Sequence, residues 1–338
     1  MSRQPSDNPD DLPTLADVAR LAGVSSATVS RVLNKTALVL PETTERVQQA
    51  ITELGYIQNM VAGSLAGARS RIVSVLVPGI ANSIFNEATE QLETELVAGG
   101  DTVILGMTGG KDEKMLPHIQ AALRRRVDAI IITGIISSPE VRSLLARRPI
   151  TVIETWGLPA DPIDIAIGFS HEAIGAALAD FARERGYRRP HLITARGSRA
   201  PLRRNGFLTA WAAAGGDPPS ESMVDIPSRF GHARGAFRDI SALDPRPDLI
   251  VTGSDWLAQG LVLEARIAGL RVPDDIGVIG FGNLAVAGEM RPTITTVDVH
   301  GTLIGRETIK VLRTRAAGGA VKERHIDTGF QIVARESA

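Results

Sequence analysis

The chain has 338 residues, with 37 lysines and arginines against 38 aspartates and glutamates, and it contains no cysteine. This length predicts two or three domains, and the lack of cysteine excludes a disulfide framework, a thiolate metal site and a thiol nucleophile. The polar start MSRQPSDNPDDLP and the lack of a long apolar run predict a cytoplasmic protein with no membrane partner and no signal peptide.

Residues 1–13 have the composition of a disordered tail. From Thr14 the pattern changes to that of an amphipathic helix, because apolar residues fall at i, i+3, i+4 and i+7. Thr14 and Asp17 predict an acidic form of the capping box, and Gly23 predicts the end of this helix. The apolar face consists of Leu15, Val18, Ala19 and Ala22.

Two more short helices are expected before residue 57. Ser25 is a good N-cap for the second, and Pro41 suits the first position of the third, which Gly55 ends. The second helix should cover the first with Ala27, Val29, Val32 and Leu33, and the third has Val47, Ala50, Ile51 and Leu54 on one face. Residues 14–57 therefore predict a helix-turn-helix domain.

Residues 58–70, QNMVAGSLAGARS, have the small and polar composition of a linker. Asn59 is able to cap a marginal helix over residues 60–65, but physical chemistry alone favours a flexible tether.

After Arg71 short runs rich in Val and Ile alternate with helical patterns such as 85–97 and 115–126. This alternation predicts parallel sheets covered by helices on both faces, and its length favours two doubly wound lobes with a ligand cleft between them. The expected strands are 72–77, 102–105, 129–133, 150–153, 165–167, 191–194, 249–252, 277–281 and 294–297.

The segment TLADVARLAGVSSATVSRVLN, followed by ALVLPETTERVQQAITELGYIQNMVAGSLAGARSRIVSVLVPGIANSIF, closely resembles the LacI/GalR family of bacterial transcription regulators. The blocks FSHEAIGAALADFARERGYRRPHLI, GSDWLAQG, VPDDIGVIGFGN and RPTITTVDVHGTLIG follow in the family's order, so the resemblance covers the whole chain. IDIAIGF and IDTGFQI look most like the gluconate-repressor branch.

The resemblance implies an all-α headpiece, a hinge helix within residues 58–70, and an α/β core like that of periplasmic sugar-binding proteins over 71–338. The N-lobe would comprise about 71–167 plus 294–320, and the C-lobe about 168–293 plus 321–338. The lobe crossings would fall near 167–170, 281–293 and 321–327. The family is dimeric, and the chain shows no heptad extension after VARESA.

The expected partner is double-stranded, pseudo-palindromic operator DNA, although the segment 14–65 carries four basic and four acidic residues and is neutral. Backbone amides, hydroxyls and helix N-termini can hold phosphates in place of bulk charge. Ser26 and Ala27 match the variable base readers, and Arg31 is the best candidate for a guanine contact. An exposed helix position without a base contact is the alternative for Arg31. The expected DNA-binding residues are Thr14, Ser25, Ser26, Ala27, Thr28, Ser30, Arg31, Asn34, Asn59, Ala62 and Leu65.

Leu65 matches the leucine that the family inserts into the minor groove from its hinge helix, with ordinary linker packing as the alternative. Such a wedge unstacks base pairs at a cost that is offset by contacts to the bent DNA.

For the effector, Arg203 matches the arginine that clamps ligands in the family, and Glu154 matches an acidic residue that accepts ligand hydroxyls. Gly282 replaces the usual pocket aspartate, while ARGSRAPLRRNGF gathers four arginines within nine residues. Guanidinium groups bind carboxylate or phosphate in a bidentate fork, so we expect an anionic, hydroxyl-rich effector. A sugar acid such as gluconate comes first and a sugar phosphate second, and a solvated face is the alternative for the arginines other than Arg203. The expected effector residues are Phe85, Glu154, Phe169, Arg196, Arg199, Arg203, Phe230, Ser254, Asp255 and Asn283.

An enzyme and a transport binding protein are the rival classes. The sequence contains no P-loop, no GxSxG elbow and no metal-ligand spacing among its six histidines, and we expect no cofactor. A transport binding protein would carry an export signal and no helix-turn-helix. The sequence therefore predicts a homodimeric regulator, a repressor of carbohydrate or sugar-acid catabolic genes, that releases its operator when effector binds.

Overall fold

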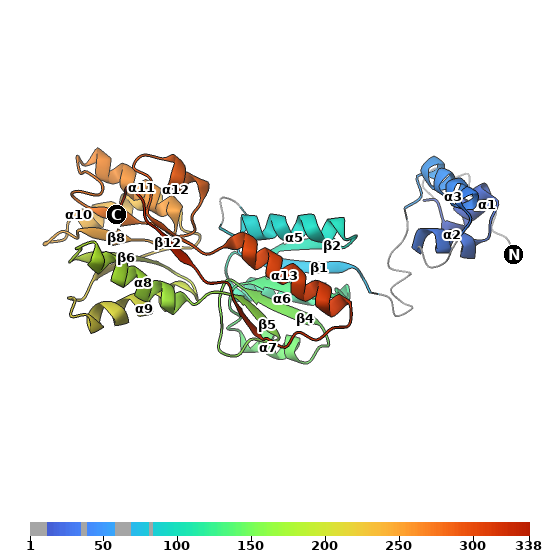
Figure 1. The fold of residues 1–338 in the computed structure, drawn as a ribbon, viewed down its shortest axis with the longest axis horizontal. Coiled ribbons are helices and arrows are strands. Elements are labelled where there is room, and N and C mark those ends of the chain that lie inside the picture. The colour runs from blue at the N-terminus through green and yellow to red at the C-terminus, as the bar shows by residue number, and fades with distance from the viewer. Residues whose placement is uncertain (1–11, 35–38, 58–68, 81–83) are drawn as a thin grey trace. The chain divides into compact units, whose positions relative to one another are not determined.

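The computed structural model describes residues 12–34, 39–57, 69–80 and 84–338 (Figure 1). The chain divides into two compact units, Met1–Ser70 and Arg71–Ala338. Within the described residues no helix is both long enough and apolar enough to cross a membrane.

The first unit contains the three predicted helices, α1 (Leu15–Ala22), α2 (Ser26–Asn34) and α3 (Pro41–Leu54). The capping box of α1 is confirmed, because the Asp17 amide donates to the Thr14 hydroxyl and the Asp17 carboxylate accepts from the Thr14 amide. Gly23 and Gly55 end α1 and α3 at φ values of 65° and 62°, which an L-residue adopts only with strain.

The core of this small unit is formed by one valine from each helix, Val18, Val29 and Val47, each 0% exposed. The expectation that Ala27 covers α1 was wrong, because Ala27 is exposed on α2. Its position in the first turn of α2 turns it toward solvent while Val29, two residues on, enters the core.

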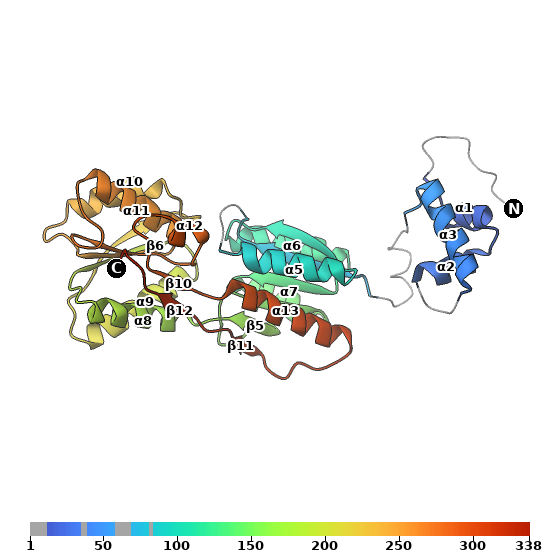
Figure 2. The ribbon, with the colours of Figure 1, turned by 45° about the horizontal axis from the view of Figure 1, so that its top comes forward.

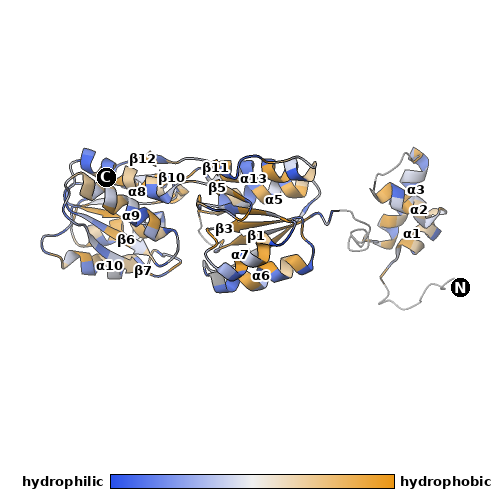
Figure 3. Cartoon of the chain, turned by 90° about the horizontal axis from the view of Figure 1, so that it is seen from below, coloured by the Kyte–Doolittle hydropathy of each residue, from blue (hydrophilic) through white to orange (hydrophobic). Residues whose placement is uncertain are grey.

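The first lobe of the second unit is built on a six-stranded parallel sheet in the order β11-β5-β4-β3-β1-β2. Helices α5 and α13 lie on one face of this sheet, and α6 and α7 lie on the other (Figure 3). The strands are β1 (Ile72–Val77), β2 (Thr102–Met107), β3 (Ala129–Thr133), β4 (Thr151–Thr155), β5 (Ile165–Gly168) and β11 (His325–Asp327). The helices are α5 (Asn86–Ala98), α6 (Asp112–Arg124), α7 (Pro139–Ala146) and α13 (Gly301–Ala316).

The second lobe repeats the plan with a four-stranded parallel sheet in the order β7-β6-β8-β9. Helices α8 and α9 cover one face, and α10 and α11 cover the other (Figure 2). The strands are β6 (Pro190–Ala195), β7 (Ser220–Val224), β8 (Leu249–Val251) and β9 (Gly277–Ile279). The helices are α8 (His171–Glu184), α9 (Ala200–Ala213), α10 (His232–Ser241), α11 (Asp255–Ile267) and α12 (Ala285–Glu289).

The chain passes between the lobes three times, and two of these crossings pair with each other. Strands β10 (Thr296–Asp298) and β12 (Gln331–Val333) form an antiparallel ribbon. This arrangement differs from the expected boundaries at two points. Thr295 still bridges to Ile279 in the second lobe. Strand β11 pairs with β5 and therefore belongs to the first lobe, although residues 321–338 had been assigned to the second.

Helices α8 and α9 pack through two glycines that leave no room for a side chain. A Cβ built at Gly175 lies 2.0 Å from the Arg203 carbonyl oxygen, and one built at Gly206 lies 2.1 Å from the Glu172 carbonyl oxygen. The backbones therefore touch directly, and this close approach fixes the position of the first turn of α9.

We expect Gly206→Ala to destabilise the core by about 1–3 kcal/mol, because the new methyl group meets backbone rather than a flexible side chain. Urea unfolding of the full chain measures the change. Gly235→Ala in α10 is the matched control, since a Cβ there meets nothing within 4 Å and should stabilise the helix by about 0.5–1 kcal/mol. Equal effects of the two substitutions would contradict the packing described here.

Candidate functional site

The first turn of α2 presents the small side chains that the sequence assigned to DNA. Ser25, Ser26 and Ala27 are exposed, and Ala27 shares a helix face with exposed Arg31, four residues on. The Ser25 hydroxyl accepts the Thr28 amide proton at 3.2 Å and hydrogen-bonds the Thr28 hydroxyl at 2.9 Å. This cap orders the turn.

Thr14 already has a partner within the headpiece. Its hydroxyl donates to the Asp17 carboxylate at 2.6 Å, and these hydrogen bonds lower the pKa of Asp17. Asp17 also pairs with Arg20 at 2.5 Å. A phosphate oxygen can only accept, so a phosphate contact from the Thr14 hydroxyl would compete with Asp17 for its proton. Three of the predicted DNA residues, Asn59, Ala62 and Leu65, lie outside the described residues, as does the side chain of Asn34.

In the second unit, several predicted effector residues meet just past the carboxyl ends of strands in both lobes. The ring of Phe85 packs edge-on against Trp156 at a centroid distance of 4.9 Å, and Trp156 packs against Phe169 at 6.1 Å. Phe169 in turn packs against Phe281 at a centroid distance of 6.5 Å. Residues from both lobes thus build one aromatic cluster, where ligands of doubly wound folds bind.

Two arginines from the start of α9 lie on this cluster. The Arg203 guanidinium stacks over the Phe281 ring at 4.1 Å, and the Arg199 guanidinium lies over Phe85 at 5.1 Å. Burial lowers the pKa of Arg203 to about 9 and that of Arg199 to about 10, with the charge of Arg199 contributing to the shift at Arg203. Both therefore keep their positive charge at neutral pH.

Neither of these arginines forms an ion pair with a carboxylate in the described part of the chain, whereas their neighbours do. Arg196 pairs with Asp225 at 3.3 Å on the exposed rim, and Arg204 pairs with Glu221. Stacking on aromatic rings offsets part of the cost of burying a guanidinium, but it does not neutralise the charge. The four-arginine segment thus divides into two arginines that pair with carboxylates and two that stack on aromatic rings.

His171 completes the cluster. It is 2% exposed, and burial, followed by the charges of Arg203 and Arg199, holds its pKa well below the usual range. Its Nδ1 accepts from Arg203 Nη1 at 3.0 Å, and its Nε2 donates to the Trp156 carbonyl oxygen at 3.0 Å.

Gly282 lies where the lobes approach each other. Its φ is +119°, and a Cβ built on it would meet Ile84 Cγ2 of the first lobe at 2.2 Å. Glycine is therefore required both by the backbone conformation and by the neighbouring isoleucine.

Asp255 and Asn283 form hydrogen bonds to the segments that cross between the lobes. Asp255 is 0% exposed, and its carboxylate accepts from the Thr296 hydroxyl at 2.6 Å and the Leu284 amide at 2.7 Å, while burial raises its pKa. The Asn283 amide donates to Asp298 at 3.0 Å and accepts from Arg335 at 2.7 Å. Both side chains thus tie the second lobe to β10 and to the segment that follows β12. Ser254 directly precedes α11, and its backbone carbonyl accepts from the Thr252 hydroxyl at 2.9 Å.

Glu154 differs from its expected role as a hydroxyl acceptor for ligand. It is 0% exposed, and its two oxygens accept the amide protons of Ile136 at 3.1 Å and Ile163 at 2.8 Å. Burial raises its pKa. The carboxylate anchors two loops of the first lobe. Phe230, just before α10, is 40% exposed, and in the described residues its ring makes no contact with the rings of the aromatic cluster.

Sequence reasoning missed Trp156, His171 and Phe281. Trp156 directly follows β4, and Phe281 follows β9 by one residue. The rule that ligands bind beyond the carboxyl ends of parallel strands would have named both.

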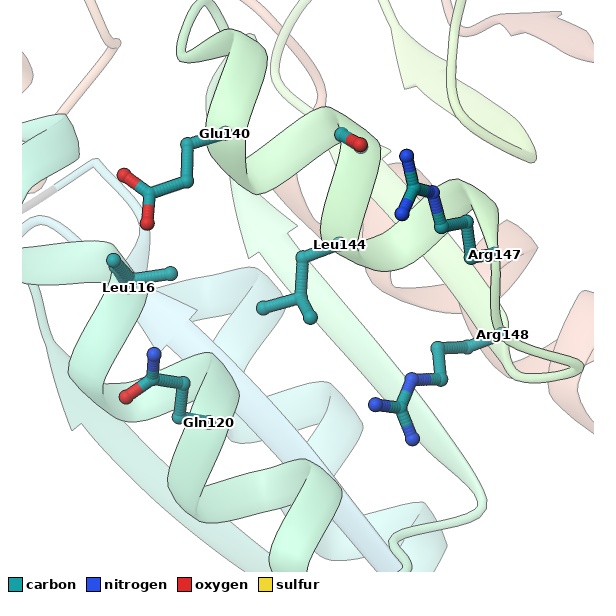
Figure 4. A pocket seen from close by; sticks show the side chains of 7 residues that line it. Leu116, Gln120, Glu140, Leu144, Arg147 and Arg148 are labelled. Carbon is teal, nitrogen blue, oxygen red and sulfur yellow. The ribbon is translucent and has the colours of Figure 1, made fainter.

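A separate surface depression of about 590 Å³ lies between α6 and α7, lined by Leu116, Gln120, Glu140, Ser143, Leu144, Arg147 and Arg148 (Figure 4). None of the predicted effector residues lines it. The described residues contain no group of three or more histidines and carboxylates placed to hold a metal ion.

A helix-turn-helix followed by a two-lobed core with a charged aromatic cluster defines the class of DNA-binding transcriptional regulators with a ligand-binding core. Comparison with known proteins identifies the family within this class. Residues 14–59 match the model of bacterial regulatory proteins of the lacI family, and residues 179–338 match a periplasmic binding protein-like domain. The chain is 34% identical to the HTH-type transcriptional regulator GntR of Pseudomonas aeruginosa, covering 96% of this chain and 95% of that protein.

Solved structures agree. A LacI-family transcriptional regulator from Silicibacter pomeroyi superposes with a TM-score of 0.89 at 28% identity, covering 96% of this chain and 99% of that one. The lac repressor dimer bound to operator and the anti-inducer ONPF superposes with a TM-score of 0.85 at 25% identity, covering 97% and 99%. The chain belongs to the LacI family of bacterial regulatory proteins.

We expect Arg31→Ala to weaken binding to a selected operator by about 1–3 kcal/mol and to relax base preference at one position of each half-site. Binding to a set of single-base operator variants measures both effects. Arg20→Ala is the control, because it removes the same charge from a residue that is paired with Asp17 on α1 and should leave the base preference unchanged. An unaltered preference profile for Arg31→Ala would contradict this role.

Stability of the core should fall as the pH drops from about 6.5, the unfolded histidine pKa, toward 4. Burial lowers the pKa of His191 to about 4, and that of His171 is also depressed, so the unfolded chain binds more protons in this window. Each histidine contributes at most about 1.4 kcal/mol per pH unit. Glu154 and Asp255, whose pKa values burial raises, act in the opposite sense as the pH falls through those raised values.

Urea unfolding at pH 7.5, 6.5 and 5.5 measures this slope. His191→Asn should flatten it, because it removes one buried base that must otherwise stay neutral. A slope that is equal in the wild type and in this variant would contradict the assignment.

Proposed function

We propose that the protein is a homodimeric repressor that binds a pseudo-palindromic operator and releases it when a small anionic polyol binds between the two lobes of its core. A sugar acid of the gluconate type is the first candidate, and the regulated genes would serve carbohydrate or sugar-acid catabolism.

The observation that carries this proposal is the pair Arg199 and Arg203. Both lie on aromatic rings, both have a pKa depressed by burial, and neither has a carboxylate partner in the described part of the chain. Partly buried cations without a counter-ion are costly, so such a pair favours an anionic ligand. The glycine at position 282, where the family usually has an aspartate, removes the charge that would repel that anion.

The rest of the ligand is expected to contact the aromatic rings and the rim. The open carbon chain of a gluconate-type acid would pack its C–H groups on the partly exposed ring of Phe85, and its hydroxyls would meet the polar groups around the strand ends. A sugar phosphate is the second candidate, because a phosphate also fits a pair of guanidinium forks.

The proposed control of DNA binding is a shift between two conformations of the dimer. Effector binds one arrangement of the lobes better than the other, and this arrangement decides whether the segment after the helix-turn-helix can fold on the operator. The neutral headpiece gives few phosphate contacts, so affinity would depend on the two-fold symmetry of the dimer and would vary weakly with salt.

We expect Arg203→Gln to lower the affinity for D-gluconate by about 10- to 100-fold, because charged hydrogen bonds to the carboxylate are lost. Isothermal titration calorimetry measures the change. Arg204→Gln, one residue away, is the matched control, since its guanidinium is occupied by Glu221 and the affinity should stay near that of the wild type.

D-Glucose and D-glucose 6-phosphate complete the experiment. A wild-type chain that binds only the neutral sugar would refute the anionic effector, and a preference for the phosphate would select the second candidate.

A further inference from the structure

His171 occupies a junction between the lobes. It is the first residue of α8 and directly follows the crossing that leaves β5, with Ser170 as the N-cap that accepts the Ala173 amide. One ring nitrogen faces Arg203 in the second lobe, and the other faces the Trp156 carbonyl of the first lobe. A single buried side chain therefore connects the arginine of the effector site to the opposite lobe.

The direction of both hydrogen bonds is fixed by chemistry. A guanidinium can only donate, so His171 Nδ1 must accept from Arg203, and a carbonyl can only accept, so Nε2 must carry the proton. The imidazole is thus neutral with a defined tautomer, and the chain Arg203–His171–Trp156 runs in one direction as a series of donors.

Arg203 has little freedom to move independently of this chain. Its guanidinium is stacked on Phe281, its Nη1 is bound to His171, and its Nη2 lies close to the backbone at Gly253, where a built Cβ would be 3.2 Å away. A shift of the fork toward a bound anion therefore pulls on His171.

Trp156 can pass such a shift into the first lobe. Its backbone has a φ of +68°, its amide donates to the Ile167 carbonyl at 3.1 Å, and its ring contacts Phe85. The ring also reaches the start of α13, where a Cβ built at Gly301 would lie 3.5 Å from Trp156 Cη2.

We propose that His171 is a positioning residue that couples capture of the anion by Arg203 to the placement of the first lobe, through its hydrogen bond to the Trp156 carbonyl. This inference rests on the proposed function, because it assigns the route by which the effector acts on the DNA-binding state. His171 orients Arg203 through one nitrogen and transmits its position through the other.

Two substitutions separate the two hydrogen bonds. His171→Asn keeps an acceptor at the place of Nδ1 and is too short to reach the Trp156 carbonyl. His171→Phe keeps an aromatic ring beside Phe169 and removes both bonds. His191→Asn is the matched control, because His191 is equally buried and bonded on both nitrogens, to Ser220 and Ser222, away from the effector site.

The experiment uses the full chain, with an operator duplex selected by the wild type from a random pool. Calorimetry with D-gluconate and D-glucose 6-phosphate gives the affinity for each probe. Operator titrations with and without a saturating probe give the coupling factor, and the thermal midpoint reports folding.

His171→Asn should keep the probe affinity within about threefold of the wild type while its coupling factor falls toward one, from a typical range of about 5- to 150-fold. His171→Phe should lose coupling and bind the probe about tenfold more weakly, because Arg203 has lost an oriented partner. His191→Asn should lower the thermal midpoint and leave affinity and coupling unchanged. A residue that only filled space would not separate affinity from coupling in this way.

Wild-type coupling in both His171→Asn and His171→Phe would overturn the inference and leave the proposed function intact. A wild-type chain that binds neither probe would overturn the proposed function, and the coupling role of His171 would fall with it.

Discussion

The guanidinium of Arg203 is held by groups that position it but do not neutralise it. The ring of Phe281 lies beneath it, neutral His171 accepts a hydrogen bond from it, and the backbone at Gly253 lies close on another side. The helix that carries it is fixed by direct backbone contact through Gly175 and Gly206. The fold therefore places a charge at the lobe junction at a cost in free energy, and a bound anion would recover that cost.

The headpiece, residues 14–65, differs from the core in that it carries no net charge. With equal numbers of acidic and basic residues between 14 and 65, it cannot depend on a broad positive field. The first turn of α2 instead exposes small hydroxyl side chains beside Ala27, and the exposed Arg31 lies one turn further along the same helix. A headpiece of this kind would gain base selectivity from geometry and hydrogen bonding more than from overall charge attraction.

Periodicity was enough to predict the local structure wherever burial was one-sided or complete. Strands β1 and β3 match their predicted bounds, and the capping box and Gly23 fix the start and end of α1. Strand β7 was not predicted, because SESMV at a sheet edge lacks the Val and Ile run of a buried strand. Strands β11 and β12 were missed because neither contains a buried residue, whereas β8 and β9, which are equally short, are buried throughout.

The effector site was predicted only in part, because several of its contacts join residues that are far apart in the sequence. Arg203 was assigned from the family resemblance and Arg199 from the clustering of arginines, but the ion pairs of Arg196 and Arg204 depend on carboxylates on another strand and the loop after it. No local pattern distinguishes Glu154 as a loop anchor from a ligand acceptor, since the amides that it binds lie 18 and 9 residues away.

The close approach of Gly282 to Ile84 has an evolutionary consequence. Replacing this glycine by the aspartate usual in the family would impose a strained backbone angle and a collision with Ile84, so it would need at least one compensating change nearby. A single substitution to aspartate would therefore give a chain that is less stable than one in which the neighbouring residue has also changed.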